Sequence, residues 1–213
     1  MKKIFLSAAA VIAMSVMVQA QFSNVKFGIK AGGNLSTQHG LDASSASLLS
    51  KGSFRGYHAG LVADVAVTEH FYLQPQLLYV RKGARYVGTN DGFDTKLTMH
   101  TIEMPLNLLY KGDVSFGKVF VGAGPVIGYA FSGKQEQNGQ SQKLYKNGLN
   151  NWRRMDISAN ATAGIEFDNG FFASVNYQRG FKDVYKGETN VKNRSVSLSV
   201  GYLMDWSKSK RKG

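Results

Sequence analysis

The chain contains no cysteine, only three prolines and, beyond its N-terminal segment, no apolar run long enough for a membrane-spanning helix. The absence of cysteine excludes a disulfide scaffold and an acylated lipoprotein cysteine, and it removes the commonest soft ligands of a structural zinc. Scarce proline beside 24 glycines favours a sheet with close backbone contacts over a disordered chain. The length of 213 residues suits one domain.

The N-terminal segment has the pattern of an export signal. Two lysines precede an apolar stretch that ends at Val18, and the small residues Val18 and Ala20 stand just before Gln21. This pattern predicts a signal peptide over residues 1–20, cleaved between Ala20 and Gln21. The formal net charge of +12 then points to an anionic membrane surface as partner, and not to nucleic acid.

The strongest signal in the remaining chain is the alternation of apolar and polar residues. Successive residues of a strand face opposite sides, so an alternating segment is a strand with one apolar face. Most segments approach the ~9–11 residues that a tilted membrane-spanning strand needs. Eight segments alternate in this way: 25–35, 57–67, 71–79, 101–110, 118–131, 155–167, 171–178 and 195–202.

The connections between these segments are short at one end of the strands and long at the other. This regularity is typical of outer-membrane barrels, whose short turns and termini are periplasmic. We therefore predict an all-β protein, an eight-stranded antiparallel up-and-down transmembrane β-barrel over residues 21–206, with a basic tail at 207–213 and an outer-membrane location. The predicted tight turns are 68–70, 111–113 and 168–170, and the long stretches lie near 36–55, 83–97, 132–152 and 180–193.

Aromatic residues on the apolar parity gather at both ends of the strands. Two aromatic rings around an aliphatic band match the two membrane interfaces, whereas a soluble lipocalin-like barrel would hide its apolar residues inside. The apolar parity is therefore predicted to face lipid. Pro75, Pro105 and Pro125 interrupt strong alternating runs, and we expect a bulge or a bend at each of them.

Charged residues on the opposite parity are predicted to fill the interior. Eight strands enclose a space just wide enough for side chains, so buried charges there must pair. A proton or ion path is the alternative use of such charges. The predicted interior network consists of Lys26, Lys30, Lys118, Asp64, Glu103 and Glu166.

A second set of basic residues lies near the long-loop ends, where lipopolysaccharide phosphates could accept charge-assisted bonds. The alternative is a solvated rim. The strand parity assigns Arg81 and Arg153 to the lipid side, and it directs Lys82 and Arg154 inward, towards groups such as Asp156. The candidate lipopolysaccharide contacts are Arg81, Lys82, Arg153 and Arg154.

Four short stretches carry a family resemblance: GIKAGGNLS at 28–36, LQPQLLY at 73–79, IEMPL at 102–106 and GAGP at 122–125. They resemble the PorT-like family of outer-membrane β-barrel domains, often called porin family proteins. The resemblance extends over about residues 22–206 and implies an integral eight-stranded barrel. One branch of the family is associated with protein export across the outer membrane, but the resemblance implies little about activity. The chain departs from common barrels because a basic segment follows its last aromatic residues.

These observations predict a non-enzymatic integral barrel with a surface-exposed structural, adhesion or export-assembly role. A narrow channel for small solutes or ions and a lipid-modifying enzyme are the alternatives. The four histidines lie in different segments, and neither the His-x-Ser pair of lipid A deacylases nor the Asp-Ser pair of lipid acyltransferases is present. We expect no cofactor, no metal and no nucleic acid, and outer-membrane lipids as partners.

Overall fold

A computed structural model describes residues 25–39, 49–52, 54–88, 94–137, 140–143, 154–181 and 192–205. The predicted signal peptide, with its cleavage site at Ala20 and Gln21, and the predicted tail at 207–213 lie outside the described residues. Among the described residues, no helix is long and apolar enough to cross a membrane.

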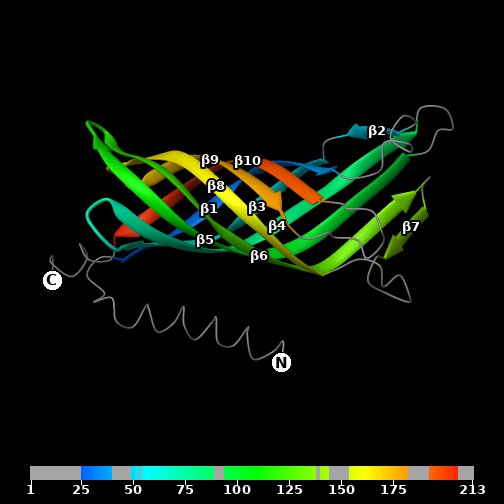
Figure 1. The fold of residues 1–213 in the computed structure, drawn as a ribbon, viewed down its shortest axis with the longest axis horizontal. Helices are drawn as coiled ribbons and strands as arrows, with labels where there is room; N and C mark the ends of the chain where they lie inside the picture. The colour runs from blue at the N-terminus through cyan, green and yellow to red at the C-terminus, as the bar shows by residue number, and fades with distance from the viewer. Residues whose placement is uncertain are drawn as a thin grey trace, which may run out of the picture.

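The described strands form a closed antiparallel barrel (Figure 1). Eight of them make the ring in the order β1-β3-β4-β5-β6-β8-β9-β10, which the β1–β10 and β4–β5 pairings close. The eight-stranded antiparallel barrel predicted from the alternation is therefore confirmed. The strands are β1 (Val25–His39), β2 (Leu49–Gly52), β3 (Phe54–Ala66), β4 (Phe71–Gly88), β5 (Asp94–Val114), β6 (Gly117–Gln137), β7 (Gln140–Lys143), β8 (Met155–Phe167), β9 (Phe171–Gly180) and β10 (Lys192–Asp205).

The two faces of the barrel wall differ as the alternation predicts. On β10, Leu198 is 63% exposed and Val200 is 62% exposed, whereas Ser199 between them is 1% exposed. Many of the buried side chains are polar or charged, and most of the large apolar side chains point outward. A water-soluble protein would reverse this arrangement, so the outer surface is suited to lipid.

The strands project farther at one end of the barrel than at the other (Figure 1). At one end, which we call the short-turn end, the predicted turns near 68–70 and 168–170 are present, and Gly170 has a φ of +89°. At the other, the long-loop end, β4, β5 and β6 extend farthest, and β2 and β7 add to the projecting parts of β4 and β6. Much of the long stretch predicted at 83–97 is thus strand, and so is the beginning of the stretch at 132–152. These extensions have no continuous apolar parity, which is why the alternation did not reveal them.

The third predicted turn, at 111–113, is wrong. Strand β5 continues to Val114, and the turn is formed by Ser115 and Phe116. A charged residue before glycine is typical of a turn, yet Lys111 is only 2% exposed, inside the barrel.

The prolines interrupt hydrogen bonding without shifting the register. Next to Pro75, β4 and β5 skip two residue pairs and resume with the same offset, and next to Pro105 and Pro125 β5 and β6 do likewise. No bulge occurs at any of the three prolines, because a missing N–H removes a bond but inserts no residue. The alternative expectation, a bend of the strand, stays a prediction. The register shift lies opposite His100 and Thr101, where β6 contributes Phe131 as an extra residue.

Candidate functional site

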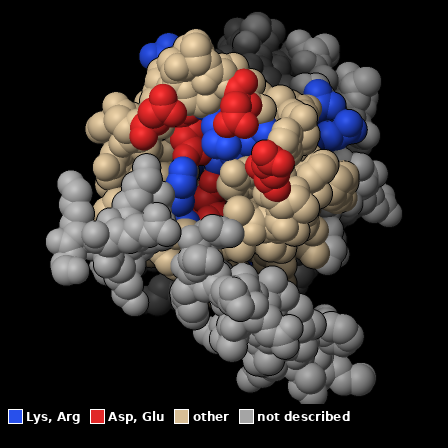
Figure 2. Space-filling view, turned by 90° about the vertical axis from the view of Figure 1, so that its left-hand side faces the viewer, with Lys and Arg blue, Asp and Glu red and all other residues tan. Residues whose placement is uncertain are grey.

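A buried lysine organises the interior near the short-turn end. The Lys111 ammonium donates to the carboxylates of Asp64 and Glu166, and all three side chains are at most 4% exposed. Lys26 donates to the other oxygen of Glu166 at 2.8 Å, and Gln74 donates to Asp64 at 3.1 Å. We call Lys26, Asp64, Lys111 and Glu166 the Lys111 cluster. Viewed from the short-turn end, acidic and basic side chains gather in the middle of the molecule (Figure 2).

Lys118 does not join this cluster. Its ammonium lies 2.8 Å from Asp113, and the two side chains are 29% and 66% exposed. Because β6 begins at Gly117, Lys118 stands beside the turn and pairs at the rim of the barrel. The predicted place of Lys118 in the interior network is therefore wrong, and Lys111 occupies that role.

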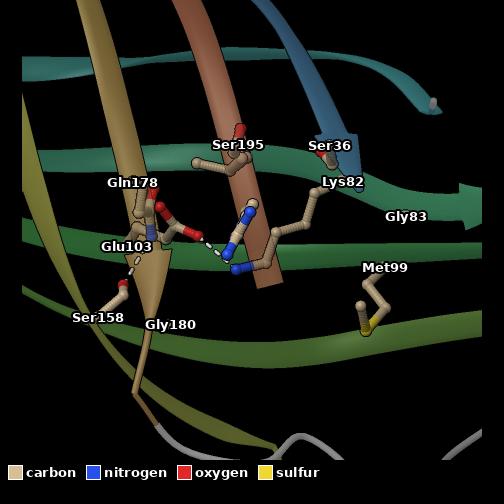
Figure 3. Close-up of a pocket in the computed structure, with 11 residues that line it drawn as sticks. Ser36, Lys82, Gly83, Met99, Glu103, Ser158, Gln178, Gly180 and Ser195 are labelled. Atoms are coloured by element: carbon tan, nitrogen blue, oxygen red, sulfur yellow. Dashed lines mark hydrogen bonds and ion pairs between the residues drawn. The ribbon is translucent and has the colours of Figure 1, made fainter. Parts of the chain in front are cut away.

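A second ion-pair cluster lies towards the long-loop end. The Lys82 ammonium donates to Glu103 at 2.7 Å and approaches Asp156 at 3.5 Å. Figure 3 shows Lys82 reaching across to Glu103, beside the hydrogen bond from Gln178 to Ser158. The inward direction that the parity gave Lys82 agrees with this geometry. Lys82 is therefore an interior residue and does not lie on the lipid surface as a lipopolysaccharide contact.

Lys30, between the two clusters, has no described carboxylate within ion-pair distance. Its ammonium donates to the amide oxygens of Gln76 and Asn176, both at 3.3 Å, although the residue is only 5% exposed.

Two cavities in the described part of the interior are of water size. A cavity of about 40 Å³ adjoins Lys30, His58 and Glu103, and one of about 20 Å³ adjoins Lys82 and Met99. A water molecule needs roughly 10–15 Å³ by this measure, so each cavity holds one to a few waters. Beyond Lys82, the buried side chains of β4 and β5 include the apolar residues Ala84, Leu97 and Met99, followed on β5 by the buried Thr95. The described interior therefore changes from charged to largely uncharged side chains on the long-loop side.

The barrel also brings together a histidine and a serine that lie far apart in sequence. His58 Nε2 lies 2.9 Å from Ser199 Oγ, and Asn176 donates to the same serine at 3.3 Å. A hydroxyl beside an imidazole is the first element of a nucleophilic site. Here both residues are buried in the lumen, next to a cavity that admits water but no lipid chain.

The structure describes two of the three remaining predicted lipopolysaccharide contacts. Arg81 faces outward, with its guanidinium 5.5 Å from the Phe54 ring and 5.9 Å from the Tyr57 ring. Arg154 is exposed just before β8. Arg153 lies outside the described residues. The described residues also contain no group of three or more His, Cys, Asp or Glu side chains able to hold a metal ion.

A polar, ion-paired lumen inside an apolar wall is the arrangement of a small membrane barrel. The family model described as "Outer membrane protein beta-barrel domain" matches residues 18–186, more than half of the chain. The chain belongs to this family. The match to this family supports an outer-membrane location for the protein. No protein with a curated function matches the chain significantly.

Solved structures with similar folds include three bacterial outer-membrane proteins. Ail, the attachment invasion locus protein of Yersinia pestis, is 16% identical with a TM-score of 0.45, and the match covers 85% of this chain and 99% of Ail. Neisserial surface protein A is 15% identical with a TM-score of 0.47, over 83% and 96% of the two chains. OprG from Pseudomonas aeruginosa is 12% identical with a TM-score of 0.44, over 85% and 97%.

Proposed function

We propose that this outer-membrane barrel protein is a sealed, non-enzymatic structural barrel that presents its long-loop end at the cell surface. The supporting observation is the described lumen, where two ion-pair clusters lie beside cavities of about 20 and 40 Å³. In this proposal the chain enters the periplasm of a Gram-negative cell by its signal peptide. Both termini and the short turns remain periplasmic.

The surface role that we propose is adhesion, or docking within an envelope or export assembly. The sheet formed by β2, β4, β5, β6 and β7 rises beyond the rest of the barrel at the proposed outer end. A rigid projecting sheet offers a partner an ordered surface at little cost in conformational entropy. The motifs at 28–36, 73–79, 102–106 and 122–125 support the PorT-like assignment.

The channel alternative gives a direct test of the seal. In planar bilayers the purified barrel is expected to produce no stable, regular single-channel openings, because ions cannot pass side chains that fill the lumen. A porin of roughly 16–18 strands, inserted under the same conditions, is the positive control. Regular openings of constant amplitude from the unmodified protein would overturn the proposal in favour of the channel.

The enzyme alternative has one observation in its favour, the contact between His58 and Ser199. We propose that this contact is structural, because a lipid substrate lies outside the barrel whereas the pair lies inside. Mass spectrometry of lipid A from cells with and without the protein should show the same species. A modification that appears with the protein and disappears in Ser199→Ala would establish an enzyme.

A further inference from the structure

Outward-facing basic side chains cluster on the part of the wall made by β4, β5 and β6. In the strand register Arg81 lies opposite His100, His100 lies opposite Ser132, and Lys134 lies opposite Thr98, one step further out. Directly opposed residues on one face have Cβ atoms roughly 5 Å apart, and adjacent strands are roughly 4.8 Å apart. The four polar side chains therefore start from adjacent positions on one outward face of the wall. The extra residue of β6 at Phe131 gives Ser132 its place in this row.

Aromatic rings place this cluster at the membrane surface. Tyr79 lies 6.1 Å from both Tyr57 and Phe131 between ring centroids, and His100 lies 6.3 Å from Phe131. Exposed aromatic side chains at strand ends mark the level of lipid headgroups. Arg81 and Lys134 stand at or just above this level, where the phosphates of anionic lipids are found.

The side chains of the cluster are oriented as donors. The Tyr79 hydroxyl lies 2.6 Å from Nδ1 of His100. A neutral imidazole that accepts a hydrogen bond from this hydroxyl at Nδ1 carries its own proton at Nε2. The Nε2–H group can then donate a hydrogen bond outward. The aromatic rings of Phe54 and Tyr57 support the Arg81 guanidinium by cation–π contact. Among the described residues, no Asp or Glu forms an ion pair with Arg81 or Lys134.

We propose that Arg81, His100, Ser132 and Lys134 form a binding site for the phosphate of a phosphorylated glycolipid in the outer leaflet. The guanidinium fork binds two phosphate oxygens, and the ammonium, imidazole and hydroxyl complete the shell. The glycolipid acyl chains lie along the apolar wall below. This inference rests on the proposed surface orientation, and it extends the predicted lipopolysaccharide contact at Arg81 to specific neighbours.

The test compares lipid binding by folded barrels in nanodiscs that contain either lipid A or enzymatically dephosphorylated lipid A. The double variant Arg81→Gln, Lys134→Gln is expected to bind lipid A at least about tenfold more weakly than the unmodified protein. The control is Lys96→Gln, Arg179→Gln, which removes the same charge from exposed residues. Lys96 lies opposite Glu136, and Arg179 lies on β9. The control variant should lose less than about threefold in affinity for lipid A. The single variant Arg81→Lys, which keeps the charge but not the guanidinium fork, should keep only part of the binding.

Two results would overturn the site. One is equal binding of lipid A and dephosphorylated lipid A by the unmodified protein, and the other is an equal loss in the double variant and its control. Competition by inorganic phosphate at concentrations comparable to lipid A would overturn the glycolipid as ligand. Failure of the proposed function appears differently, as regular channel openings of the unmodified protein in planar bilayers.

Discussion

Replacing Lys111 with methionine is expected to destabilise the folded barrel by about 3–5 kcal/mol. The substitution leaves the carboxylates of Asp64 and Glu166 buried without their shared cation, and only Lys26 still pairs with Glu166. Methionine keeps most of the length and volume of the side chain, but it loses the ammonium and with it the cation–π contacts to the Tyr72 and Phe120 rings, whose centroids lie 4.6 and 5.7 Å from Nζ. The change therefore removes the charge with little change in volume. Urea-dependent unfolding in lipid vesicles, followed by gel mobility without boiling, measures the loss.

The matched control is Lys30→Met. Lys30 is also buried, but it donates only to amide oxygens, so its removal orphans no carboxylate at hydrogen-bonding distance. We expect a loss of at most about 1.5 kcal/mol, the value of ordinary hydrogen bonds. Equal losses in the two variants would show that the Lys111 cluster contributes nothing specific.

Replacing Gly124 with alanine, which adds a single methyl group, is expected to destabilise the barrel by at least about 3 kcal/mol or to prevent folding. A Cβ at Gly124 would overlap the backbone carbonyl of Leu106 and lie 2.8 Å from the Cα of Asn107 on the neighbouring strand. Backbone atoms cannot move aside as a flexible side chain can. The glycine is required where β5 and β6 approach each other beside Pro105 and Pro125. The yield of folded Gly124→Ala in vesicles tests this.

Gly128→Ala is the matched control on the same strand and the same face. The nearest atoms to its new Cβ are Thr101 Cγ2 at 3.5 Å and Glu103 Cγ at 3.6 Å, which are ordinary contacts. Gly128→Ala should fold with unchanged or slightly higher stability, because alanine restricts the unfolded chain. If both variants fold equally well, the close approach of β5 and β6 is not a constraint.

The wall of the barrel could be predicted from the sequence because the bilayer demands strict alternation. Leu198, Ser199 and Val200 show why: lipid and lumen impose opposite chemistry on neighbouring residues. The projecting parts of β4, β5 and β6 could not be predicted in this way. Their outward residues, such as Lys96 and Lys134, meet no hydrocarbon, so a polar strand there has the composition of a loop.

The partners inside the lumen could be predicted only in part. Parity alone places Asp64, Glu103 and Glu166 inside, but it does not give the stagger between strands that decides which charges meet. Lys111 is 47 residues from Asp64 and 55 from Glu166, and His58 is 141 from Ser199. The shear of a closed barrel sets such pairings. Parity marked Lys82 as inward, whereas its preference for Glu103 over Asp156 depends on distances only the structure supplies.

The central claim, a sealed lumen inside a lipid-facing apolar wall, is tested most directly by single cysteines at three successive positions of β10. The absence of native cysteine makes each substitution a unique probe. Spin labels attached to Leu198→Cys and Val200→Cys before folding into vesicles should collide with lipid-dissolved oxygen and not with a water-soluble nickel chelate. Ser199→Cys, nearly isosteric with serine, should resist a water-soluble maleimide in the folded barrel and react in urea. Labels at 198 and 200 without lipid contact, together with rapid reaction at 199 in the folded protein, would contradict the account.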